Sequence, residues 1–283
     1  MHRRELFKGL IFGLAALQTT KSFGQDIMAI GEKDKDLEKD QALDPATADR
    51  MQYKIKHFDE DFPDDIYVSE AEAKVLARVV KKLTLAKKLV GYGHFNLIGF
   101  DDILKILTFS ELGPFTKVEL DFIESTYCRD ARDYGFFGDK VLSEITAKID
   151  TSKAIKIAGT GHFLYRGRPE KLYAELKADI GSDIVLTSGI RSVVKQLDLF
   201  YNKAVQCHGN LSRASRSLAP PGYSFHGIGD FDVGKIGFGA DNFTDNFATT
   251  DVYKRLTDLG YVDIRYTETN SYGVRFEPWH IKV

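Results

Sequence analysis

The chain has 283 residues, of which 43% are apolar and 28% are charged, and its formal net charge is −2. This length suits one large domain, or a small domain joined to a medium one. The absence of a strongly basic block argues against nucleic-acid binding, which needs side chains that neutralise phosphates. Two cysteines, Cys128 and Cys207, are too few for a disulfide-built scaffold, and their pairing stays open at this point.

Residues 1–24 are predicted to be a signal peptide. Arg3 and Arg4 precede a short apolar run over residues 9–17, and Ser22 and Gly24 are small residues placed before a cleavage site. The run is too short to anchor the chain in a bilayer. The arginine pair followed by Leu-Phe-Lys favours the twin-arginine route, with an ordinary secretory signal or an uncleaved amphipathic start as alternatives. We expect an exported, periplasmic or cell-envelope protein without a membrane span after signal removal.

Residues 25–65 are predicted to be a charged linker. Just over half of residues 31–50 are charged, with both signs mixed and no apolar period. Such a segment buries too little apolar surface to offset the entropy lost on ordering it.

Residues 66–150 are predicted to be a helical region. Ser69 with Glu72, and Thr116 with Glu119, are capping-box patterns that mark helix starts. A further helix is expected from about Asp101. The first helix carries an apolar stripe at helical spacing and ends at Gly91; the stripe consists of Val75, Val79, Leu83, Ala86 and Val90. We find packing but no chemistry in this region, and its role stays open.

Residues 151–283 are predicted to form an α+β domain in which a small antiparallel sheet is flanked by helices. Two β-type runs, Tyr261–Thr267 and Val274–Phe276, flank a turn sequence and predict a hairpin. Other β-type runs cover residues 154–158 and 183–186, and helices are expected over about 169–180, 191–205 and 251–259.

The chemistry is concentrated between Pro220 and Gly234 and near the C-terminus. A hydrolytic zinc site needs three protein ligands and an open position for water. His226 is followed by Asp230 and Asp232, which share one face of a short predicted strand, and either carboxylate could be a ligand. His280 is a candidate for the third ligand, although it lies far along the chain.

Glu277 lies three residues before His280 and is a candidate proton acceptor. On a regular strand these two side chains would point to opposite faces. Pro278 interrupts regular strand pairing, so a local bend could direct both side chains toward the same metal.

A second histidine, His162, follows the sequence Gly159-Thr160-Gly161. This pattern is similar to a phosphate-binding loop but lacks the lysine and the serine or threonine that such loops use. We therefore assign it no catalytic role.

Three motifs in this order resemble the D-Ala-D-Ala metallopeptidase family, which includes vancomycin-resistance-type D,D-carboxypeptidases, lysostaphin-type endopeptidases and the hedgehog domain. The pattern S-x-H-x-x-G-x-A-x-D is met at Ser224, His226 and Gly229. The later E-x-W-H element is met by Glu277 and His280. The upstream S-G-x-R-S-x-x-x-Q element is met by Ser188, Gly189, Arg191, Ser192 and Gln196. The resemblance covers residues 151–283.

The sequence departs from the family pattern at the aspartate. The family places it seven residues after the histidine, where this chain has Val233, and the family alanine is also missing. Asp232, six residues after His226, matches best with a one-residue deletion. Asp230 remains the alternative ligand.

The resemblance implies one Zn²⁺ per chain, held by His226, Asp232 and His280, with Glu277 as general base and acid. It implies that Arg191 contacts the substrate's carboxylate or carbonyl, since a guanidinium can grip a carboxylate with two hydrogen bonds. Gln196 and Ser224 are expected to bind substrate in the pocket.

The expected function is removal of the terminal D-alanine from peptidoglycan stem peptides. Two alternatives stay open: a peptidoglycan endopeptidase of the same family, cutting an L-Ala-D-Glu or cross-link bond, and a non-catalytic cell-wall-binding module. The oligomeric state cannot be predicted from these patterns.

Overall fold

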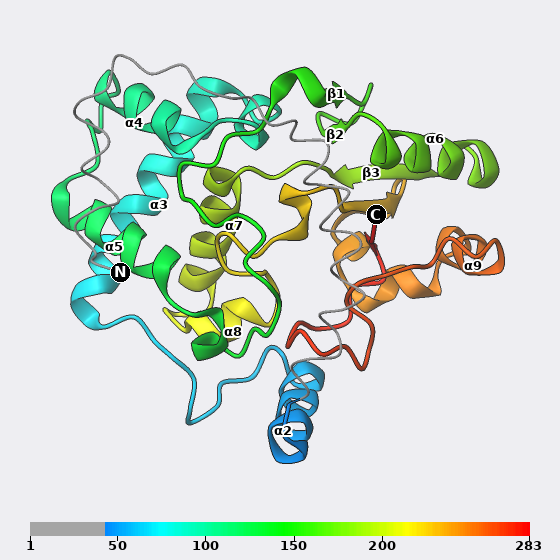
Figure 1. The fold of residues 1–283 in the computed structure, drawn as a ribbon, viewed down its shortest axis with the longest axis horizontal. Helices are drawn as coiled ribbons and strands as arrows, with labels where there is room; N and C mark the ends of the chain where they lie inside the picture. The colour runs from blue at the N-terminus through cyan, green and yellow to red at the C-terminus, as the bar shows by residue number, and fades with distance from the viewer. Residues whose placement is uncertain (1–42) are drawn as a thin grey trace, which may run out of the picture. The chain divides into compact units, whose positions relative to one another are not determined.

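The computed structural model describes residues 43–283, and Figure 1 shows the path of the chain. Helices and small antiparallel sheets together confirm the predicted α+β class. The predicted signal peptide, residues 1–24, lies outside the described residues. The helices are α2 (Pro45–Lys56), α3 (Glu70–Val90), α4 (Phe100–Thr108), α5 (Lys117–Cys128), α6 (Arg168–Ile180), α7 (Val193–Gln206), α8 (Leu211–Ser215) and α9 (Asp251–Asp258), and the strands are β1 (Ala154–Lys156), β2 (Phe163–Tyr165), β3 (Ile184–Ser188), β4 (Phe231–Lys235) and β5 (His280–Ile281).

The predicted helical region packs around α3, which contacts α4, α5 and α7 (Figure 1). Both predicted capping boxes are present. The Ser69 hydroxyl accepts from the Glu72 N–H at 3.2 Å while the Glu72 carboxylate accepts from the Ser69 N–H at 2.8 Å. Thr116 and Glu119 form the same pair of contacts at the start of α5. Gly91 ends α3 with a φ of 88°, a backbone conformation that favours glycine.

The sheet that carries the predicted site has the order β3-β4-β5, with both pairs antiparallel. Side chains alternate along β4, so Phe231 and Val233 enter the hydrophobic core while Asp232 faces the opposite side. α6 packs on β3 and contributes Tyr173 and Leu176 to this core. The alternation therefore places the acidic residue on the face away from α6.

The predicted hairpin at residues 261–276 is wrong. These residues form no ladder with one another, and Ile264 makes a single bridge to Ile281. The side-chain amide of Asn270 donates to the carbonyls of Thr267 and Val274, at 2.7 Å each. Because this side chain binds carbonyls within the turn, it stabilises a compact loop in place of two paired strands.

The predicted linker is wrong for residues 44–65, which form α2 and an ordered segment after it. Asp44 caps the helix by accepting the N–H of Thr47 at 3.1 Å, and Pro45 occupies the first turn. Met51 and Ile55, four residues apart, are buried. The high charge density of this stretch concealed a short amphipathic helix.

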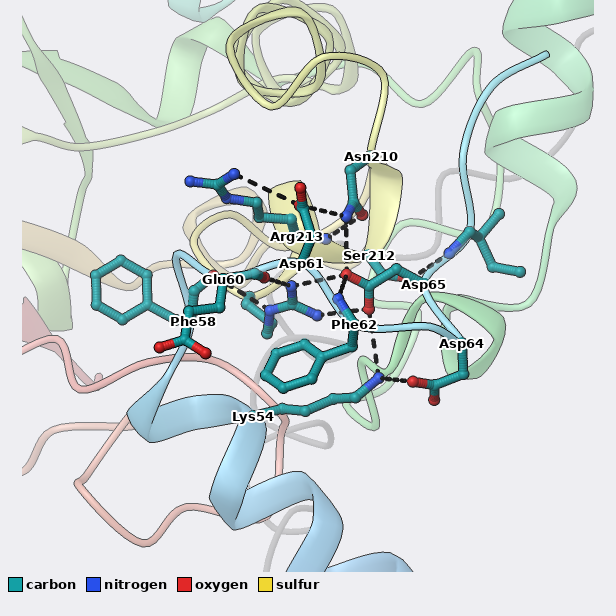
Figure 2. A network of polar contacts seen from close by, with 12 residues as sticks. Lys54, Phe58, Glu60, Asp61, Phe62, Asp64, Asp65, Asn210, Ser212 and Arg213 are labelled. Atoms are coloured by element: carbon teal, nitrogen blue, oxygen red, sulfur yellow. Dashed lines mark hydrogen bonds and ion pairs between the residues drawn. The ribbon is translucent and has the colours of Figure 1, made fainter.

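A buried ion-pair network attaches this segment to α8. Arg216 donates to Asp65 through two nitrogens, at 2.9 and 3.0 Å. Figure 2 shows Asn210 and Lys54 converging on the same carboxylate, at 2.8 and 3.3 Å. Although burial opposes ionisation, hydrogen bonds from Arg216 and Asn210 lower the pKa of Asp65 well below its ordinary value. Residues 44–283 thus form one compact unit.

Two further features of the described residues bear on earlier expectations. Cys128 is exposed and Cys207 is buried, and both are free thiols. Within residues 43–283, no helix has the length and apolar character needed to cross a bilayer.

Replacing Arg216 with Met is expected to lower the free energy of unfolding by about 3–5 kcal/mol, because it leaves the buried Asp65 carboxylate without its main partner. Urea denaturation followed by circular dichroism measures the change. Arg213→Met is the control, because Arg213 pairs at 3.4 Å with the exposed Asp61, and such a pair contributes below about 1 kcal/mol. Equal losses in the two variants would contradict the structural role given to the network.

Candidate active site

Three metal-type ligands converge from three separate elements. His226 lies in the short 3₁₀ turn η5 (Phe225–Gly227), Asp232 lies on β4 and His280 lies on β5. Asp232 and His280 are direct partners in the antiparallel ladder, which puts their side chains on one face. One ligand atom from each residue lies within 4.8 Å of the others, and all three residues are buried. The three predicted ligands are therefore together.

The orientation of His226 is set by a glycine. Its Nδ1 donates to the carbonyl of Gly189 at 2.8 Å, so Nε2 keeps a free lone pair and lies 3.2 Å from Asp232 Oδ1. A Cβ on Gly189 would lie 2.0 Å from the Phe163 carbonyl oxygen. Only glycine fits this position, which explains the glycine of the upstream motif.

Asp230 orients His280 from the far side of the ring. It accepts from His280 Nε2 at 2.9 Å, from Arg265 Nε at 2.8 Å and from the Val283 N–H at 3.1 Å. His280 Nδ1 then lies 3.2 Å from Asp232 Oδ1. The geometry separates the two candidate aspartates: Asp232 belongs to the cluster of ligand atoms, and Asp230 supports the histidine behind it.

The electrostatics of the cluster fit a bound cation. Burial lowers the pKa of His226 to about 4, and Arg191 acts in the same direction. Burial also disfavours charge on His280, but hydrogen bonds to Asp230 and Asp232 prevail and raise its pKa to about 9. Despite burial, His226 and Arg191 hold the pKa of Asp232 well below its ordinary value. Two imidazole nitrogens and a carboxylate oxygen in a buried site are the ligand types that Zn²⁺ favours.

Glu277 reaches the cluster through the predicted bend. The His280 N–H donates to the Glu277 carbonyl at 3.1 Å, which closes a turn across Pro278. This turn brings Glu277 Oε2 to 3.8 Å from His280 Nδ1. Burial raises the pKa of Glu277 to about 7, partly offset by His280, so its carboxylate is a stronger base than an exposed one.

Arg191 follows β3 and contacts the cluster directly. Its Nε donates to Ser188 Oγ at 3.0 Å, and its Nη2 pairs with Asp232 Oδ2 at 2.5 Å. Ser188 is also the ladder partner of Asp232 across a β-bulge. The guanidinium is thereby fixed beside Asp232, with further N–H groups left for other partners.

The three predicted ligands, together with Glu277 and Arg191, line one cavity of about 350 Å³. Ser224 lines it as predicted. Gln196 does not: it is buried behind the wall and its amide donates to the carbonyl of Ala219, which does line the cavity. The remaining lining includes the aromatic side chains of Phe243, Tyr266 and Trp279.

Sequence reasoning missed the basic side chains of this cavity. His162, given no role above, lines it together with Lys195, Lys203 and Arg275. Lys195 and Lys203 are eight residues apart on α7, a spacing that repeats one helix face. That spacing is visible in the sequence, but it indicates a cavity wall only when the position of α7 is known.

Comparisons with known proteins agree with this arrangement. The family model VanY, described as D-alanyl-D-alanine carboxypeptidase, matches residues 168–283, which contain the whole predicted site. No curated protein matches the chain.

Solved structures with similarity include the LdcB LD-carboxypeptidase, at 21% identity and a TM-score of 0.37 over 45% of this chain and 62% of that one. Another is VanYB in complex with D-alanine-D-alanine, at 23% identity and a TM-score of 0.38 over 46% of this chain and 75% of that one. The chain thus spans less than two thirds of the length of the LdcB structure. The family match confirms the resemblance inferred from the motifs. The C-terminal part of the chain, residues 168–283, is therefore similar to the VanY-type D-alanyl-D-alanine carboxypeptidase family.

Proposed function

We propose that the protein is a zinc-dependent carboxypeptidase that hydrolyses the terminal D-alanine from peptidoglycan stem peptides. The observation that carries this proposal is the convergence of His226, Asp232 and His280 within 4.8 Å, beside the buried Glu277 in one cavity. The family match over the same residues supports the reaction class. The bond and the substrate are part of the proposal.

His226 Nε2, Asp232 Oδ1 and His280 Nδ1 would hold the zinc ion. When bound, zinc supplies Lewis acidity, which polarises a carbonyl and lowers the pKa of a water molecule toward neutrality. The hydrogen bonds from the two imidazoles to Gly189 and Asp230 fix the ring orientations before the metal binds. The protein therefore does not have to reorganise these rings for coordination.

Glu277 would move the protons of the reaction. It accepts a proton from the attacking water and later donates it to the amine nitrogen of the leaving D-alanine. A pKa near 7 suits both steps near neutral pH. Arg191, held by Ser188 and Asp232, directs its remaining N–H groups to the oxygen that becomes negative during attack.

The same carboxylate favours a hydrolase over a binding module. Burial raises the pKa of Glu277, because its ionised form loses hydration at this position. A module that only bound peptide would have no use for an ionisable group held in that way. An enzyme uses it as the proton acceptor.

We also propose that the protein is exported. The pattern of residues 1–24 supports a cleaved signal peptide, and peptidoglycan lies outside the cytoplasmic membrane.

Replacing Glu277 with Gln is expected to lower kcat for D-alanine release by roughly 10²–10⁴-fold, the usual contribution of a general base. The variant should still bind zinc, because Glu277 is not among the three ligands. A D-alanine oxidase assay and metal analysis measure the two quantities. Glu268→Gln, at an exposed carboxylate, is the matched control and should keep parental turnover. Parental turnover in Glu277→Gln would show that the base is assigned wrongly.

Asp232→Asn is expected to abolish stoichiometric zinc binding, since it removes the anionic ligand. Asp230→Asn should weaken zinc binding by about 10–100-fold, the usual effect of losing a group that orients a ligand. Competition with a chelator, followed by metal analysis, measures both affinities. A stronger loss in Asp230→Asn than in Asp232→Asn would reverse the assignment.

Digestion of purified muropeptides identifies the bond. The proposed function predicts that each digested stem peptide loses the mass of one alanine residue and that free D-alanine accumulates. Mass spectrometry before and after incubation detects both products. Release of a larger peptide fragment without free D-alanine would identify an endopeptidase instead.

A further inference from the structure

One face of α7 forms a basic wall of the cavity. Lys195, Leu199 and Lys203 line it at four-residue intervals, which repeat one face of a helix. Ser192 caps the start of α7 by accepting the N–H of Lys195 at 3.2 Å. Residues on the other side of α7 pack in the core, so the helix is fixed in place and presents its two lysines to the cavity.

Neither ammonium group has a hydrogen-bond or ion-pair partner among the described residues. The nearby carboxylate of Asp198 is bound to Lys87 at 2.8 Å. Among residues 43–283, two carboxylates line the cavity: Asp232 belongs to the metal-type cluster, and Glu277 lies beside it. Within the part of the chain that the structure describes, no carboxylate therefore neutralises the two lysines.

Burial makes these charges costly without a ligand. It lowers the pKa of Lys195 to about 8 although Asp198 opposes the shift, and Arg191 and Lys87 act in the same direction as burial. Burial also lowers the pKa of Lys203. An anion that enters the cavity would restore the interactions that each ammonium lost on leaving bulk water.

A third cationic side chain, from the C-terminal segment that precedes β5, adds to the basic lining. Arg275 lines the same cavity, with its Nη2 bound to the carbonyl of Phe243 at 2.7 Å and its guanidinium 4.9 Å from the Trp279 ring. No carboxylate among the described residues pairs with it. The cavity is therefore strongly basic away from the metal-type cluster.

The spacing of the lysines indicates the size of the ligand. Eight residues of α-helix rise about 12 Å. An extended peptide covers that distance in about three to four residues. A peptide that carries two carboxylates at this separation would place one beside each lysine.

We propose that Lys195 and Lys203 form two anion subsites that select acidic peptides with two carboxylates three to four residues apart. This inference rests on the proposed function, because it names the substrate class of the same site. A stem peptide with a free C-terminal carboxylate and a glutamate three residues earlier meets the requirement. Replacing either carboxylate with a carboxamide should then weaken binding.

The test uses the pentapeptide L-Ala-γ-D-Glu-L-Lys-D-Ala-D-Ala and two forms of it. One form has the glutamate α-carboxylate replaced by a carboxamide, and the other has an amidated C-terminus. Isothermal titration calorimetry with the full-length Glu277→Gln protein measures binding without turnover. Each amidation is expected to weaken binding by roughly tenfold or more, the scale of one charge-assisted hydrogen bond.

The lysine variants assign each subsite to one carboxylate. Lys195→Met and Lys203→Met keep the apolar stem and remove the charge. Each should lose the preference for one carboxylate and retain the preference for the other. Lys171→Met is the matched control, because Lys171 is exposed on α6 outside the cavity, and it should keep both preferences. If a lysine variant fails to fold, the titrations of the three peptides with the protein that keeps both lysines still provide an independent test.

The outcomes separate this inference from the proposed function. Equal affinity for the acidic and amidated peptides, or unchanged preferences in both lysine variants, overturns the two subsites even when the unaltered enzyme releases D-alanine. Lysine-dependent preference for the acidic peptide, with no D-alanine released by the unaltered enzyme, supports the subsites and overturns the proposed reaction.

Discussion

The antiparallel pairing of β4 with β5 is the constraint on which the site depends. It places Asp232 directly opposite His280 and joins residues 48 positions apart in the sequence. Alternation along β4 then sends Phe231 and Val233 into the core, so core packing fixes the register that aims Asp232 at the cluster. A slip by one residue would bury the carboxylate in the core and expose two apolar side chains.

A shell of hydrogen bonds around the cluster adds to this constraint. Gly189 holds His226, Asp230 holds His280, and Ser188 holds Arg191. Gly189 and Ser188 belong to the upstream motif, which therefore builds the site as much through supporting contacts as through direct ones. Gln196 follows the same principle, because it supports the wall at Ala219 in place of contacting the cavity. Some motif residues thus line the cavity, and others support the residues that line it.

The helical region, residues 66–150, contributes to the cavity indirectly, because its helix α3 supports α7. This helix packs against α3 on one side and presents Lys195 and Lys203 on another. A region that showed only packing in its sequence therefore supports a wall of the cavity. The buried Asp65–Arg216 network attaches residues 44–65 to the same unit.

Several parts of the fold and site were predictable from sequence because their signals are local. The capping boxes at Ser69 and Thr116 involve residues three apart, and the motifs pointed directly to His226, Asp232 and His280, which the structure brings together. The motif match already favoured Asp232 over Asp230, and the register of β4 with β5, which no local pattern contains, gives the geometric reason. The hairpin failed because the Asn270 side chain competes for backbone carbonyls, and α2 was hidden by charge. The basic wall depended on tertiary packing of α7.

We expect one metal ion to bind among His226, Asp232 and His280. Anomalous diffraction from crystals of the zinc-loaded protein, recorded on both sides of the zinc absorption edge, tests it directly. One strong anomalous peak per chain is expected, bonded to an imidazole nitrogen from each histidine and to an Asp232 oxygen. A peak bound to other residues, or these three side chains turned apart with no peak between them at full zinc occupancy, would contradict it.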